Sequence, residues 1–92
     1  MNKYTFFEDP GHGWLQVPIA ELQALGIAGQ ISSYSYRRGE FAYLEEDCDY
    51  SRFVEARKAA GNPLQRENIA TVYQENTPIR GYACFNQRKA AA

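Results

Sequence analysis

Apolar and polar residues alternate near the start of the chain, and this alternation predicts a β-hairpin. The run KYTFF at 3–7 is β-prone and leads into EDPGHG at 8–13, whose Asp-Pro-Gly and second glycine are strong turn signals. The run GWLQV at 13–17 then alternates as a half-buried strand does. Pro18 suits the first position of a short helix, which we expect to stop near residue 25 because Gly26 matches a left-handed helix cap.

The middle of the chain predicts a second hairpin and a longer helix. In SYSYRRGEFAYLE at 33–45, aromatic residues stand at alternate positions on both sides of a turn at 37–40. In DYSRFVEARKAAG at 49–61, apolar residues recur at helical spacing, and basic residues and a glycine mark the C-terminal end. We expect Asp47 or Asp49 to cap the N-terminus of this helix.

Two further β-rich runs predict a third hairpin. They cover 69–74 and 80–85 and are separated by a turn at 76–78. The resulting order is β-β-α-β-β-α-β-β, which is typical of an α+β fold: a mostly antiparallel sheet with two helices packed on one face. The alanine-rich end at 87–92 is expected to fray.

Length and composition indicate a single globular domain over 1–92. The chain is 45% hydrophobic and 23% charged, well away from the composition of disordered proteins. Ten basic and eleven acidic residues leave a net charge of -1, so the overall field does not attract nucleic acid or anionic lipid. Binding to nucleic acid would require a local basic patch.

Cysteine usage and the N-terminal residues favour a cytoplasmic protein. Cys48 and Cys84 are far apart in sequence, and the N-terminal residues MNKYTFFEDPG contain no apolar stretch of signal-peptide length. No run approaches the roughly 20 apolar residues of a membrane span. We therefore expect reduced thiols and no contact with a membrane.

The acidic stretch YLEEDCD at 43–49 is the main candidate for function. It is too compact for a calcium loop and offers too few Cys and His residues for zinc, so we expect no dedicated metal site and no cofactor. One carboxylate can cap the following helix. The others form either a solvated patch or a contact surface for a protein partner, which we assign to Glu45, Glu46, Asp47 and Asp49.

A second candidate lies in the sequence YSYRRG, where aromatic and basic residues interleave. Tyr34, Tyr36, Arg37 and Arg38 could bind single-stranded nucleic acid by stacking and by contacts to phosphates. The alternative is structural: the two tyrosines pair across the hairpin with aromatic residues of the next strand. The acidic residues in the same hairpin favour this alternative, because they would repel phosphates.

Three isolated residues have weaker functional readings. His12, flanked by glycines, could act in acid–base chemistry with Asp9, but a histidine in a turn is usually only a polar turn residue. Trp14 is expected to anchor the core. Arg80 could bridge to the acidic stretch as a structural ion pair. We expect no catalytic residues.

Four blocks of the chain resemble a known protein family: DPGHGWLQVPIAELQALGI, ISSYSYRRG, YLEEDCD and TPIRGY. Over residues 4–85 the chain is similar to small uncharacterised proteins of proteobacterial phages, prophages and conjugative elements. The resemblance implies a setting and assigns no activity or site. Small acidic proteins of mobile elements are, as a class, similar to accessory and anti-defence proteins that block a host complex.

The sequence therefore favours a non-enzymatic module that binds a host or mobile-element protein complex, for example as an anti-CRISPR or anti-restriction inhibitor. The acidic stretch would be offered to a basic partner that normally holds nucleic acid. The alternative is a nucleic-acid or nucleotide-binding module that uses the hairpin at 34–38. A homodimer formed through an edge strand such as 80–85 stays open.

Overall fold

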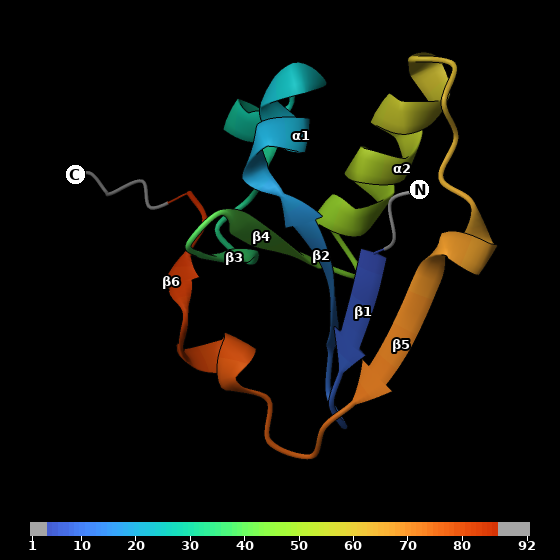
Figure 1. The fold of residues 1–92 in the computed structure, drawn as a ribbon. Coiled ribbons are helices and arrows are strands. Elements are labelled where there is room, and N and C mark those ends of the chain that lie inside the picture. Colours follow the sequence, from blue (N-terminus) through green and yellow to red (C-terminus); the bar gives the residue numbers. More distant parts are fainter. Residues whose placement is uncertain (1–3, 87–92) are drawn as a thin grey trace.

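A six-stranded sheet forms the centre of the computed structural model, which describes residues 4–86 (Figure 1). The fold is α+β. Its elements are β1 (Tyr4–Glu8), β2 (Gly13–Pro18), α1 (Ile19–Ala24), β3 (Tyr36–Arg38), β4 (Phe41–Glu45), α2 (Asp49–Ala59), β5 (Ile69–Tyr73) and β6 (Ala83–Cys84). Three short 3₁₀ turns, at Ala28–Gln30, Arg66–Asn68 and Pro78–Gly81, complete them.

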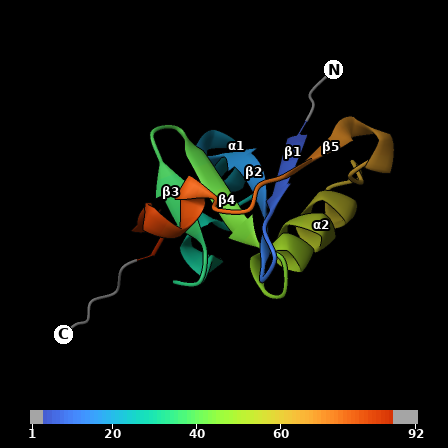
Figure 2. The same cartoon turned by 90° about the horizontal axis from the view of Figure 1, so that it is seen from below.

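The strands lie in the order β5-β1-β2-β4-β3-β6, and all neighbours except β1 and β5 are antiparallel. The expected mostly antiparallel sheet is therefore confirmed. The prediction of a third hairpin is wrong, because its two strands do not pair with each other. β5 pairs parallel with β1 at one edge of the sheet, and β6 pairs with β3 at the other edge. The segment between them crosses the sheet, as Figure 2 shows. Within this crossing segment, Pro78 begins a 3₁₀ turn whose N-terminus is capped by the Thr77 hydroxyl.

The first two hairpins form where the sequence predicts them. Phe7 lies opposite Trp14 in the first, and Tyr36 lies opposite Tyr43 in the second. Gly39 has a φ of 62° in the turn of the second hairpin, a conformation that suits glycine. Tyr34, however, precedes β3 and is 67% exposed, so its predicted pairing across the hairpin does not occur.

The main core lies on one face of the sheet. Leu15 and Leu44 from neighbouring strands are fully buried there, as are Leu22 of α1 and Phe53 of α2. Both helices thus contribute to the same core cluster, as expected for helices that cover a sheet. Alternation along the central strands β2 and β4 places Leu15, Val17, Ala42 and Leu44 in this cluster.

The opposite face carries a smaller aromatic cluster. Trp14 is 2% exposed and packs with Tyr43 and Ile79, which confirms its predicted role as a core anchor. Ile79 belongs to the 3₁₀ turn that follows Pro78, so the crossing segment covers this face. The candidate site lies at the margin of this smaller cluster.

The two helices of the fold are short. Within residues 4–86, neither is long and apolar enough to cross a membrane. The predicted fraying at 87–92 lies outside the described residues.

Candidate partner-binding site

Asp49, the last carboxylate of the acidic stretch, is a structural group. Its side chain is fully buried and accepts hydrogen bonds from the Ser32 N–H at 3.1 Å, the Ser32 hydroxyl at 2.7 Å and the Ser35 hydroxyl at 2.5 Å. The N-cap position of α2 is Cys48, and no side chain caps it. The expected cap by Asp47 or Asp49 is therefore wrong. Because it is buried, Asp49 cannot form part of a contact surface in this structure.

Glu45, the first carboxylate, is almost buried at 8% exposure. It ends β4 on the same sheet face as Trp14, which lies opposite it in β2. One oxygen of Glu45, Oε1, accepts the backbone N–H of Asp47 at 3.0 Å. The other, Oε2, lies 3.5 Å from Nδ1 of His12, so the imidazole of His12 is next to Glu45. The expected pairing of this imidazole with Asp9 is not observed; the Asp9 carboxylate accepts the backbone N–H of His12 instead.

Glu46 and Asp47 are the two exposed carboxylates of the stretch. We call Glu45, Glu46 and Asp47 the acidic turn. Partial burial raises the pKa of the Glu46 carboxyl, and repulsion from the Asp47 and Glu45 carboxylates raises it further. The acidic turn is therefore a cluster of like charges that interact with one another.

Arg80 bonds to Asp9 instead of the acidic stretch, so its predicted bridge to that stretch is wrong. Its Nε and Nη2 atoms donate to the two oxygens of Asp9 at 2.7 and 3.0 Å. The bonds from Arg80 hold the pKa of Asp9 well below its usual range, with help from the backbone N–H groups of His12 and Gly11. The Arg80 guanidinium also lies 5.4 Å from the Trp14 ring centroid. The charges of Arg80 and Asp9 thus cancel beside the acidic turn.

A hollow of about 440 Å³ opens beside the acidic turn. We call it the aromatic–acidic hollow. It brings together residues from four segments distant in sequence, and its lining includes His12, Trp14, Tyr34, Tyr36, Glu45 and Asp47, with Arg80. Sequence reasoning identified most of these residues singly but assigned them to three separate candidate sites.

The predicted nucleic-acid patch is dispersed over the sheet. Tyr36 is half-buried with its ring centroid 6.3 Å from that of Trp14. Arg37 and Arg38 are exposed, but they alternate along β3 and so lie on opposite faces. Arg37 lies over the Phe85 ring at 5.3 Å, whereas Arg38 lies over another ring, that of Tyr82, at 5.2 Å. The four residues do not form one continuous surface.

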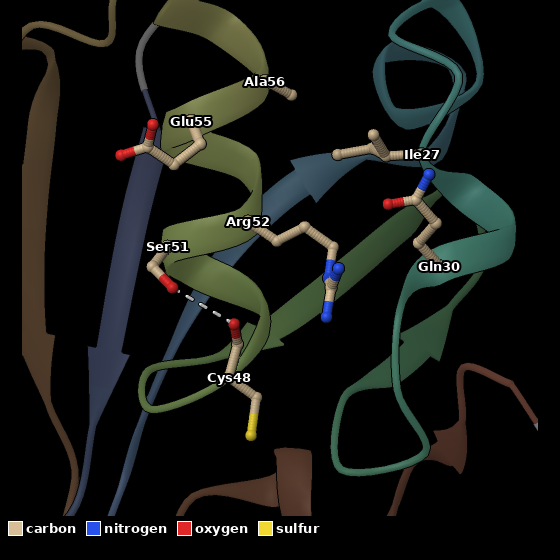
Figure 3. A pocket seen from close by; sticks show the side chains of 7 residues that line it. All are labelled: Ile27, Gln30, Cys48, Ser51, Arg52, Glu55 and Ala56. Atoms are coloured by element: carbon tan, nitrogen blue, oxygen red, sulfur yellow. Dashed lines mark hydrogen bonds between the residues drawn. The ribbon is translucent and has the colours of Figure 1, made fainter.

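A second hollow, of about 470 Å³, lies between α2 and the Ile27–Gln30 segment (Figure 3). Arg52 extends from α2 toward Gln30 across this hollow. Cys48 lines both hollows, and burial and the Glu45 carboxylate raise the pKa of its thiol. A raised thiol pKa opposes formation of the reactive thiolate.

The signals that sequence reasoning missed are contacts between distant segments. Asp49 is a buried acceptor because the hydroxyls of Ser32 and Ser35 donate to it. Asp9 is a buried acceptor because Arg80 donates to it. None of these pairs has a spacing typical of a motif. Among residues 4–86, no group of three or more His, Cys, Asp or Glu side chains could hold a metal ion.

The candidate site combines three features that distinguish it from the rest of the described surface. These features are the acidic turn, the ion pair of Arg80 with Asp9, and the aromatic–acidic hollow. Comparison with known proteins identifies no matching family model, no similar curated protein and no similar solved structure.

Proposed function

We propose that this chain is a non-enzymatic protein-binding module of a mobile genetic element, which docks its acidic turn onto a basic region of a host complex. The resemblance noted in the sequence favours an anti-defence role, such as inhibition of CRISPR interference or restriction. The observation that carries the proposal is the acidic turn, where two exposed carboxylates, Glu46 and Asp47, adjoin the nearly buried Glu45.

Like charges held close together favour a cationic partner. Partial burial and then repulsion from the Asp47 and Glu45 carboxylates raise the pKa of Glu46, and both disfavour its charged form in the free protein. A basic surface placed against the acidic turn would replace this repulsion by attraction. A host protein that holds nucleic acid offers such a basic surface, and complementary charge would mainly accelerate the encounter.

The chemistry of the candidate reactive groups supports a non-enzymatic role. The His12 imidazole is adjacent to Glu45, and the thiol of Cys48, which lines the same hollow, has a raised pKa. A cysteine nucleophile would need a lowered pKa. The Arg80 guanidinium, which could stabilise an anionic intermediate, is already bound by both oxygens of Asp9.

Charge reversal tests the proposal directly. The double variant Glu46→Lys, Asp47→Lys should lose capture of a nucleic-acid-handling complex from nuclease-treated host lysate, measured by mass spectrometry. The matched control is Glu40→Lys, Glu67→Lys, which changes the net charge equally at two exposed positions away from the acidic turn. Circular dichroism establishes that both variants are folded. Equal capture by the two variants would refute the proposal.

One observation favours binding of single-stranded nucleic acid as a second candidate function. Tyr34 is 67% exposed, and Arg37 and Arg38 are exposed nearby in sequence. A stacking and phosphate-binding role predicts binding of a single-stranded oligonucleotide that weakens steeply between low and moderate salt. A gel-shift titration at two salt concentrations measures this, and the acidic-turn proposal predicts no shift at either.

A further inference from the structure

The aromatic–acidic hollow contains an almost buried carboxylate, that of Glu45. Glu45 has a side-chain exposure of 10%, and its Oε2 lies 3.5 Å from His12 Nδ1, while the Cys48 thiol also hydrogen-bonds to this carboxylate. The His12 side chain is itself 47% exposed. A buried carboxylate is costly unless a hydrogen-bonding cation or donor pairs with it. The hollow thus holds a largely buried carboxylate whose nearest cationic group is a half-exposed imidazole, and a further cation could pair with it.

Aromatic side chains line the hollow along with the two carboxylates. Tyr34 and Tyr36 contribute from the segment before β3 and from β3 itself, and Trp14 contributes from β2. The faces of such rings attract cations, and arginine guanidinium groups stack on them. The protein already makes this arrangement once beside the hollow, where Arg80 lies over Trp14 and is bonded to Asp9.

The charges around the hollow select a cation over a phosphate. Arg80 donates two hydrogen bonds to the Asp9 carboxylate, so its positive charge is offset by that carboxylate. The two carboxylates of Glu45 and Asp47 therefore give the lining a negative character. A nucleotide phosphate would meet these carboxylates, whereas a guanidinium would pair with them.

We infer that the aromatic–acidic hollow receives an arginine side chain of a protein partner, with the guanidinium between Glu45 and the Tyr34 ring. This inference rests on the proposed function and identifies the residue type that the partner presents to the same site. Arginine is favoured over lysine because its planar guanidinium can pair with a carboxylate through two bonds while it stacks on a ring. Such a buried arginine is a frequent binding hot spot at protein interfaces.

The test uses two short peptides of equal charge, one rich in arginine and one rich in lysine, titrated into the full chain. Trp14 is the sole tryptophan, so its indole resonance and fluorescence report on the hollow. We expect the arginine peptide to perturb Trp14 and to bind more tightly than the lysine peptide. The variant Tyr34→Ala should weaken arginine-peptide binding about two- to fivefold, whereas Tyr34→Phe, which keeps the ring, should retain it. Because Tyr34 is exposed, neither change should unfold the protein.

The outcomes separate this inference from the function on which it rests. Equal binding of both peptides, or a Tyr34→Ala variant that binds as well as wild type, overturns the arginine inference. If both peptides bind equally but lose affinity in Glu46→Lys, Asp47→Lys, docking through the acidic turn stands and the arginine site is refuted. If neither peptide binds and capture is also insensitive to charge reversal, both proposals fail.

Discussion

Replacing Asp49 by alanine should destabilise the fold severely, although the residue belongs to a stretch that looks like a surface patch in the sequence. The Ser35 hydroxyl donates to Asp49, and its oxygen accepts the backbone N–H of Glu45 at 3.0 Å. Asp49 thereby connects the start of α2 to the end of β4. The substitution leaves three donors without their acceptor: the Ser32 N–H, the Ser32 hydroxyl and the Ser35 hydroxyl.

The expected loss follows from the burial of these donors. Ser35 is fully buried, so its hydroxyl cannot turn to water, and such a stranded donor costs about 1–3 kcal/mol. Ser32 is half-buried, so water can replace part of what it loses. The sum is about 3–5 kcal/mol, which agrees with the cost of breaking a buried charged network. A chain of 92 residues has about 5–14 kcal/mol of total stability, so the variant should be marginal.

Urea denaturation followed by circular dichroism measures the free energy of unfolding. The matched control is Asp47→Ala, an exposed carboxylate two positions earlier, which should change stability by less than about 0.5 kcal/mol. Asp49→Asn keeps one acceptor oxygen and should fall between the two. A loss below about 1 kcal/mol for Asp49→Ala, or an equal loss for Asp47→Ala, would refute the division of the acidic stretch into buried and exposed carboxylates.

Three further predictions follow from other contacts. Burial and the Glu21 carboxylate raise the pKa of Tyr4 from 10.0 to about 12. Wild type should therefore lose stability as the pH rises between these values, whereas Tyr4→Phe should not, and urea unfolding across this pH range measures the difference. The bonds from Arg80 lower the pKa of Asp9 in the folded state, and the resulting stabilisation is complete above the unfolded value of 3.8. Arg80→Gln should therefore be less stable than wild type at neutral pH. The difference in unfolding free energy should shrink as the pH falls below 3.8. A methyl group on residue 13 would collide with the Phe6 ring, so Gly13→Ala should cost about 1–3 kcal/mol in thermal or urea unfolding, and a neutral result would contradict the packing.

Local patterns in the sequence predict most of the fold. Alternation of apolar residues and turn chemistry locate the first hairpin and the turn at Gly39, and helical spacing locates α2. They fail at the third hairpin, because β-propensity identifies a strand without identifying its partner. Pairing of β5 with β1 depends on contacts between residues more than sixty positions apart, such as Thr5 with Ala70. No local signal encodes that choice.

The candidate site is less predictable because neighbouring carboxylates in one stretch have different environments. Alternation along β4 places Glu45 on the same face as Trp14, whereas the turn after it leaves Glu46 exposed. Asp49 is buried because the serines of 32–35 pack against the start of α2. The charge pattern alone cannot distinguish these positions. Burial of each carboxylate is set by the geometry where a strand passes into a helix.

This position between two fixed elements also gives the acidic turn its suitability for binding. On one side β4 is held between β2 and β3, and on the other side Asp49 anchors the start of α2 to Ser35. The backbone of Glu46 and Asp47 spans the short distance between these anchors, and the Glu46 N–H donates to the Gly13 carbonyl at 3.0 Å. A surface that is already ordered loses little conformational entropy when a partner binds. The network that makes Asp49 unavailable to a partner is therefore what holds the two exposed carboxylates in place.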